Sequence, residues 1–167
     1  MTIAQSIVPE FDHEMAGTRK VLERVPEGRF DWKPHPKSMS LGRLATHLAE
    51  VPGWAAHTMD GTEFDVMPPG QSKPTFSSLA SRADILALFD QNVAAARATI
   101  GQRADADFMV PWTLKKGGAA VFTLPRVAVL RSMVLNHNVH HRAQLGVYLR
   151  LLDIPVPALL GPTADER

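Results

Sequence analysis

The carboxyl-terminal part of the sequence carries two histidines, His137 and His141, one helical turn apart within residues 135–152. At about 100° per residue, an i, i+4 pair lies on one face of a helix, and Leu130 and Tyr148 fall near the same face. Two imidazoles in this arrangement can converge on one metal ion at about 2.0–2.1 Å. The spacing therefore predicts half of a metal site.

A third histidine strengthens this prediction. His47 falls in the apolar stripe of another predicted helix, where it shares a face with Leu44 and Leu48. A histidine on an apolar face is more often a hydrogen-bonded core residue than a metal ligand, and this alternative stays open. His140 also lies near the inward face, so the residues alone leave pairing at i, i+3 open.

Four stretches have apolar residues that recur at three- and four-residue steps, the pattern of an amphipathic helix. We predict these helices over residues 2–25, 41–57, 82–100 and 126–152. Ser40 and Ser81 are suited to cap the second and third helices, because a serine hydroxyl accepts a hydrogen bond from a free amide of the first turn. Prolines are expected to disturb the first helix at Pro9, to bend the second at Pro52 and to stop the fourth at Pro155.

Two connections are longer than simple turns. Residues 60–79 are rich in proline and glycine and predict a crossover along a whole helix, between the second and third helices. Residues 107–124 contain two short β-prone runs around Gly117 and Gly118, which predict a short hairpin before the fourth helix. With so few strand signals, we predict one domain over residues 1–167 of the all-α class, a four-helix bundle. Such bundles build ligand sites from inward side chains on facing helices.

The composition is that of an ordinary globular protein, with 45% hydrophobic and 21% charged residues. A net charge of +1 argues against nucleic-acid binding, which needs a strong basic field. The chain has no cysteine, so a metal ion would be bound by histidine, carboxylate or water. The amino terminus has no signal-peptide pattern and no run approaches 18 apolar residues, so we expect a cytoplasmic protein with no membrane partner.

The stretches SMSLGRLATHLAEVPGW, LNHNVHHRAQLGVYLRLLDIPVP and GPTADE together resemble the DinB family of damage-inducible, metal-binding four-helix bundles. This family is related to bacterial thiol-dependent enzymes such as mycothiol-dependent maleylpyruvate isomerase and the bacillithiol transferases. The resemblance covers nearly the whole chain, and its most specific part is the single histidine of the second helix with the HxxxH of the fourth. It implies an up-down-down-up helix order, a homodimer, and a divalent metal ion on His47, His137 and His141.

A centre of three neutral imidazoles leaves at least one coordination position open, which is typical of catalytic rather than structural sites. Zinc and nickel are the metals expected first, with iron and cobalt as alternatives. We expect Gln144, Glu50 or His140 to orient the imidazoles. Trp54 and Tyr148 are expected to wall a pocket for an organic small-molecule substrate.

Two functions are compatible with these predictions. The first is a metal-dependent thiol transferase or hydrolase, with a low-molecular-weight thiol as candidate cosubstrate. The second is a non-catalytic metal-binding bundle of the stress response. The open centre favours the enzyme, whereas the lack of an evident general acid or base favours the binding protein.

Several residues remain outside these functional predictions. No role is assigned to His13, His35 or His57. Val129 and Val147 are apolar residues beside the inward stripe of the fourth helix, and they are available either to a homodimer contact or to packing within the chain.

Overall fold

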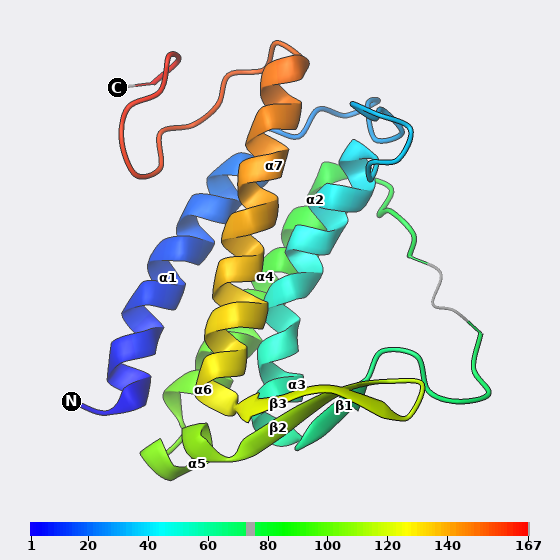
Figure 1. Cartoon of the computed structure of the whole chain (residues 1–167). Coiled ribbons are helices and arrows are strands. Elements are labelled where there is room, and N and C mark those ends of the chain that lie inside the picture. Colours follow the sequence, from blue (N-terminus) through cyan, green and yellow to red (C-terminus); the bar gives the residue numbers. More distant parts are fainter. Residues whose placement is uncertain (73–75, 167) are drawn as a thin grey trace.

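The computed structural model describes residues 1–72 and 76–166 (Figure 1). Its helices and strands are, in chain order, α1 (Ile3–Leu22), α2 (Leu41–Glu50), η1 (Val51–Gly53), α3 (Trp54–Asp60), β1 (Glu63–Asp65), α4 (Arg82–Gly101), α5 (Asp105–Met109), β2 (Pro111–Lys116), β3 (Ala119–Pro125), α6 (Arg126–Val129), η2 (Leu130–Asn136) and α7 (His137–Leu151). The four predicted helices are therefore present, and two of them are divided.

Side-chain caps and prolines account for the ends of the first three predicted helices. The hydroxyls of Ser40 and Ser81 each accept the amide hydrogen three residues ahead, which confirms both predicted caps. Thr2 forms a capping box at the start of α1. Pro9 lies inside α1 without ending it, whereas Pro52 lies in the 3₁₀ turn η1 that separates α2 from α3.

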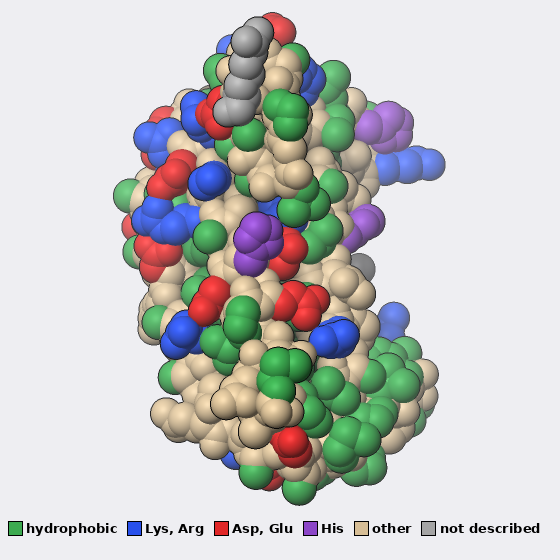
Figure 2. All heavy atoms as spheres, turned by 90° about the vertical axis from the view of Figure 1, so that its left-hand side faces the viewer, with side chains coloured by type: hydrophobic (Ala, Val, Ile, Leu, Met, Phe, Trp, Pro, Cys, Tyr) green, Lys and Arg blue, Asp and Glu red, His purple; other side chains and the backbone are tan. Residues whose placement is uncertain are grey.

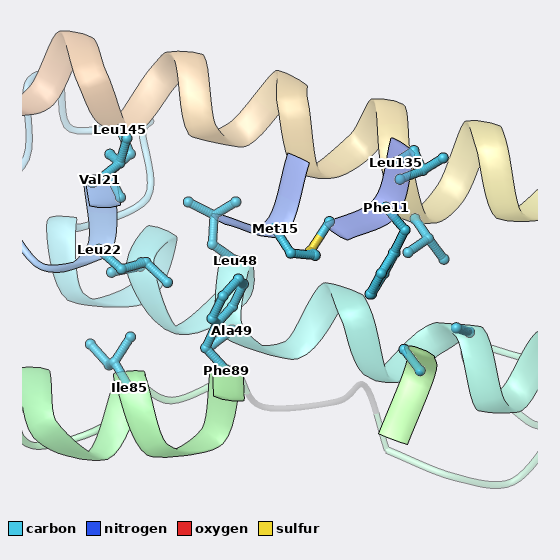
Figure 3. Packing of buried hydrophobic residues seen from close by; sticks show 14 of the residues in the cluster. Phe11, Met15, Val21, Leu22, Leu48, Ala49, Ile85, Phe89, Leu135 and Leu145 are labelled. Atoms are coloured by element: carbon cyan, nitrogen blue, oxygen red, sulfur yellow. The ribbon is translucent and has the colours of Figure 1, made fainter. Parts of the chain in front are cut away.

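The long helical segments pack side by side around the hydrophobic core. In Figure 1, α1 and α7 run toward one end of the molecule, while α2 and α4 run the opposite way. Buried side chains from all four segments meet between them, among them Phe11, Leu48, Phe89 and Leu145 (Figure 3). Removal of this apolar surface from water stabilises the helical layer without help from a ligand.

A three-stranded sheet lies at one end of this helical layer (Figure 1). β2 and β3 form an antiparallel hairpin, as predicted, and its turn uses Gly117 and Gly118 at φ values of 64° and 81°. Two such residues in the left-handed region match the twist of a tight hairpin. β1 then pairs with β2 in parallel, which makes the sheet mixed.

The predicted all-α fold class is wrong, because the chain combines its helices with this mixed sheet. β1 has only three residues, too few to show an alternating pattern, and it lies within the proline- and glycine-rich crossover. Tertiary contacts hold it in place. The Asp65 carboxylate accepts the amide hydrogens of Gly117 at 3.1 Å and Gly118 at 2.7 Å, which ties the crossover to the hairpin turn. Residues 73–75 of the predicted crossover lie outside the described residues.

The fourth predicted helix, residues 126–152, is not regular throughout. α6 passes into the π-helical segment η2, and α7 begins directly after it at His137. A π-helical turn holds more residues than an α-helical turn, and such segments are frequent near functional sites. Angular positions worked out for a regular α-helix therefore apply within α7, but not across η2.

The two valines considered for a homodimer contact differ in burial. Val129 is 1% exposed and packs within the chain, so it is not available to a partner. Val147 is 59% exposed on α7. The homodimer stays a prediction.

The surface carries both signs of charge. Figure 2 shows acidic and basic side chains interspersed on the face turned to the viewer, and hydrophobic side chains gathered toward the end that carries the sheet. The even charge balance of the sequence thus also holds locally on this face. Within residues 1–72 and 76–166, no helix is both long and apolar enough to cross a membrane.

Candidate metal centre

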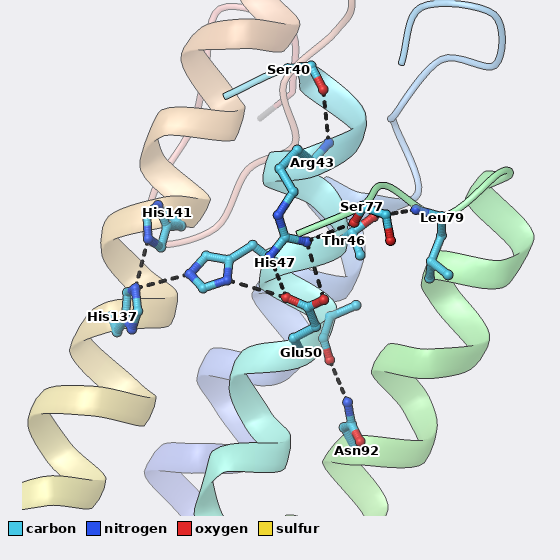
Figure 4. Close-up of polar contacts among 11 residues, drawn as sticks. Ser40, Arg43, Thr46, His47, Glu50, Ser77, Leu79, Asn92, His137 and His141 are labelled. Carbon is cyan, nitrogen blue, oxygen red and sulfur yellow. Dashed lines mark hydrogen bonds and ion pairs between the residues drawn. The ribbon is translucent and has the colours of Figure 1, made fainter. Parts of the chain in front are cut away.

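Three histidines from two facing helices bring their ring nitrogens together (Figure 4). His47 comes from α2, and His137 and His141 come from α7. Nε2 of His137 lies 3.2 Å from Nε2 of His47 and 2.8 Å from Nε2 of His141. The candidate ligand atoms of the three residues all lie within 4.8 Å of one another, so this group could hold a metal ion.

Contacts at the outer ring nitrogens set the direction of the lone pairs. Nδ1 of His141 lies 2.7 Å from Oε1 of Gln144, and an amide oxygen only accepts, so His141 donates from Nδ1. Nδ1 of His47 faces Oε2 of Glu50 at 3.5 Å, which favours the same tautomer. Among the described residues, the buried Nδ1 of His137 has no hydrogen-bond partner. The Nε2 lone pairs of His47 and His141 are therefore directed into the cluster.

This arrangement fits a metal ion. Two nitrogens at about 2.0–2.1 Å from a tetrahedral ion are about 3.3 Å apart. The Nε2 atoms of His47 and His137 are 3.2 Å apart, and those of His137 and His141 are closer, at 2.8 Å. With its proton on Nδ1, His137 would direct a third lone pair to the same point, where a cation could bind all three nitrogens. Neutral nitrogen donors suit zinc, nickel, cobalt or ferrous iron.

Burial favours the neutral form of His137 and His141. It lowers the pKa of His137 to about 4, and charges on His141 and His47 act in the same direction. The backbone of Met133 opposes this shift, although its geometry falls short of a hydrogen bond. Burial also lowers the pKa of His141, against the opposing contact with Gln144. An imidazole must be neutral to bind a metal ion, so both rings are prepared for binding at neutral pH.

The metal-free protein is expected to lose stability as the pH falls from about 6.5 to about 4. The pKa of His137 is lower in the folded than in the unfolded chain, so in this window the unfolded chain binds more protons and the free energy of unfolding decreases. Below about pH 4 the ring is protonated in both the folded and the unfolded chain, so the contribution of His137 to the free energy of unfolding no longer changes with pH. Denaturant titrations in the presence of a chelator measure the free energy of unfolding across this pH window. Its decrease should be smaller in His137→Gln than in the wild type, and equal decreases would contradict the lowered pKa.

The carboxylate beside His47 is held by an arginine. Arg43 donates from Nη2 and Nη1 to the two oxygens of Glu50 at 2.6 and 3.2 Å (Figure 4). Burial alone would raise the pKa of Glu50, but the contacts with His47 and Arg43 outweigh it and the pKa is lowered. The sequence interpretation missed Arg43, although spacings of four and seven residues place it on the same helix face as His47 and Glu50. The ion pair positions the carboxylate against the imidazole.

Replacing Glu50 by alanine is expected to weaken metal binding about 10-fold to 100-fold, because residues that orient a ligand typically have effects of this size. A competition titration with a chromophoric chelator measures the dissociation constant. Glu10→Ala is the matched control, since Glu10 pairs with Arg131 on the exposed surface of the molecule. Equal dissociation constants for the two variants would show that Glu50 does not position His47.

The cluster borders a cleft of about 770 Å³, which is lined by residues of α2, α3, α4 and the crossover. Trp54 lines this cleft, and the centroid of its ring lies 5.2 Å from that of His137 and 5.9 Å from that of His47. Trp54 therefore lies beside two of the three histidines. Phe64 and Phe76 of the crossover also line the cleft and were not predicted, because a proline- and glycine-rich connection has no periodic pattern to orient its side chains.

Tyr148, predicted to wall the pocket, is not among the residues that line the cleft, although it contacts one of them, Met39. Its hydroxyl donates to the carbonyl oxygen of Met39 at 3.3 Å, and its ring packs edge-on against Trp32 at 5.6 Å. These contacts attach α7 to the connection that precedes α2. Tyr148 thus has a structural role in the contacts described.

The remaining histidines lie in different surroundings. His140 is exposed, its Nε2 lies 3.1 Å from Nε2 of Gln144, and its ring packs edge-on against that of His141 at 4.8 Å. His57, which received no role, lines the cleft beside Phe64. His35 accepts from a backbone amide of the connection between α1 and α2, and His13 lies on α1.

The fold combines helices with a small mixed sheet and places three histidines between two facing helices. A protein of this class could bind a metal ion at that group. Residues 10–145 match the model of the DinB superfamily, and the chain belongs to that superfamily. Two solved structures are similar, a DinB-like protein from Bacillus cereus and one from Bacillus subtilis. The first has 19% identity and a TM-score of 0.69 over 92% of this chain and 95% of that chain. The second has 18% identity and a TM-score of 0.67 over 97% and 99%. No curated protein matches the chain.

Proposed function

We propose that the chain binds a divalent metal ion through His47, His137 and His141 and uses it in a reaction on a small organic molecule. The observation that carries this proposal is the convergence of three imidazoles, in a group without a carboxylate, beside an open cleft. Three protein ligands leave at least one position for water or substrate, whereas structural sites normally use four. Zinc and nickel are the first candidates, with iron and cobalt as alternatives.

The metal ion, when bound, supplies a Lewis acid that lowers the pKa of a coordinated water or thiol. The residues of the chain prepare the site for this role. Glu50 and Gln144 hold the rings of His47 and His141 with Nε2 directed inward. Trp54 covers one side of the cluster and limits the access of water. Three neutral imidazole ligands would leave the charge of a bound divalent cation uncompensated, so the loaded site would favour an anionic ligand over a neutral one.

Thiol transfer is the leading reaction, and hydrolysis is the alternative chemistry of the same centre. Both reactions need an electrophilic substrate held next to the three imidazoles. The aromatic side chains of Trp54, Phe64 and Phe76 along the cleft suit a substrate with an apolar part. A transferase consumes a low-molecular-weight thiol in proportion to product, whereas a hydrolase needs only water.

The test therefore compares turnover with and without a thiol. Protein reconstituted with zinc or nickel is incubated with 1-chloro-2,4-dinitrobenzene and with p-nitrophenyl esters, each in the presence and absence of a low-molecular-weight thiol. Cobalt-substituted protein reports thiolate binding through new absorption bands. The transferase proposal fails if thiols neither change the cobalt spectrum nor support turnover.

A non-catalytic metal-binding protein, active in the stress response, is the second candidate. One observation favours it: Glu50, the carboxylate in the lining of the cleft, is engaged by Arg43 and His47 and is not free to act as a general acid or base. Such a protein would bind metal tightly and remain inactive in both screens.

A further inference from the structure

A second, smaller pocket lies between α3, the sheet and the start of η2. Its volume is about 120 Å³. Most of its wall is apolar, and its main lining residues are Trp54, Phe64, Val66, Trp112, Leu114 and Val129. We call it the apolar pocket.

The apolar pocket has a closed floor and an accessible mouth. Trp112 and Val129 form the floor and are 4% and 1% exposed. Phe64 and Val66 at the mouth are 42% and 39% exposed. These two residues also line the large cleft beside the histidines. The apolar pocket therefore adjoins that cleft.

One indole connects the apolar pocket with the metal centre. Trp54 lines both the pocket and the cleft, and its ring centroid lies 5.2 Å from that of His137. Trp54 thus borders both the histidine cluster and the pocket, and a ligand that occupies both would pass beside it. The end that reacts and the end that is recognised would lie on either side of Trp54.

Two polar groups in the pocket wall are already paired, and a third, the imidazole of His57, packs against the ring of Phe64. The indole Nε1 of Trp112 donates to the backbone carbonyl of His57 at 3.1 Å. The hydroxyl of Thr58 donates to the carbonyl oxygen of Trp54 at 2.9 Å. A polar group brought into this pocket would lose its hydrogen bonds to water without gaining these partners, which is unfavourable. The rest of the lining is apolar and favours an uncharged, apolar group.

We propose that the apolar pocket is a specificity subsite that holds a phenyl or short branched alkyl group of a ligand whose thiol or anionic end binds at the three histidines. The ligand class is thus an aryl or branched-alkyl thiol, or an acid of the same shape. The size agrees, since an apolar cavity of roughly 150 Å³ holds a benzene molecule. The metal-binding end of this ligand rests on the proposed function, whereas the apolar end does not.

The first measurement uses metal-free protein, so it does not depend on the proposed function. Toluene is titrated into the protein while the indole N–H resonances are followed by NMR. Trp54 and Trp112 line the pocket and their resonances should shift with saturation. Trp32 packs against Tyr148 elsewhere and serves as the internal control. If toluene leaves the Trp54 and Trp112 resonances unchanged, the subsite does not exist.

Variants that fill the apolar pocket test whether toluene binds there. Leu114→Phe on β2 should abolish the toluene-induced shifts, and Val121→Phe on β3, where the side chain is 58% exposed, is the matched control. Val66→Phe fills the mouth at an exposed position and provides a second variant if the first folds poorly. Shifts that persist in both folded filling variants would overturn the assignment.

The second measurement tests the whole ligand on cobalt-substituted protein. 2-Phenylethanethiol should bind roughly 30-fold more tightly than ethanethiol, because the phenyl group leaves water. Leu114→Phe should remove most of this preference. If toluene binds but no thiol reaches the metal, the subsite stands and the proposed function fails. If both thiols bind equally and toluene does not bind, the subsite fails and the metal-based function stands.

Discussion

Replacing His137 by alanine is expected to abolish stable metal binding. Nε2 of His137 lies 3.2 Å from Nε2 of His47 and 2.8 Å from Nε2 of His141. Without His137, only two of the three ring nitrogens remain to bind the ion. We expect the affinity to fall by more than about 100-fold, above the range for residues that only orient a ligand. Elemental analysis of the purified variant should show metal content falling from about one ion per chain to nearly none.

Two histidine variants control for this result. His35→Ala should retain full metal content, because His35 lies in the connection between α1 and α2 and contacts its own backbone. His140→Ala should lose little, since His140 is not one of the three histidines whose ring nitrogens converge. Full occupancy in His137→Ala, or loss in His140→Ala instead, would show that the ligand set is assigned wrongly.

Removing the metal is expected to lower the melting temperature by about 8–16 °C without unfolding the protein at room temperature. A metal ion that binds only the folded chain adds about 4 kcal/mol when its free concentration is about 1,000 times the dissociation constant. In a chain of this size, each kcal/mol corresponds to about 2–4 °C. The core contributed by Phe11, Leu48, Phe89 and Leu145 does not depend on the metal, so the helices should persist.

Thermal unfolding followed by circular dichroism, with and without a chelator, measures this difference. His137→Ala provides the control, because a variant that holds no metal should show no change on chelation. Complete loss of the helical signal at room temperature after chelation would mean that the metal is structural, and it would remove the argument for an open coordination position.

The three histidines could be predicted from helix geometry, whereas the residues around them depend on how the helices pack. His137 and His141 are four residues apart, so their approach follows from helix geometry within α7. His47 had to be assigned to the inward face of a second helix, and the structure brings it to the pair. Tyr148 shares the direction of His141 around the helix axis, but seven residues along a helix correspond to about 10 Å. Its angle around the helix was therefore compatible with the pocket wall, but its position along the helix brings it beside Trp32.

The sequence by itself determined the long helices, their caps at Ser40 and Ser81, the hairpin turn and the inward faces that carry the three histidines. These features depend on periodic patterns and on residues a few positions apart, which are local properties. Only the tertiary structure decided that β1 joins the hairpin, that Phe64 returns to the cleft and that Trp54 lies between the histidines and the apolar pocket. The physical reason is that these contacts join segments far apart in the chain, and the proline- and glycine-rich crossover between them has no repeating pattern to indicate where its side chains pack.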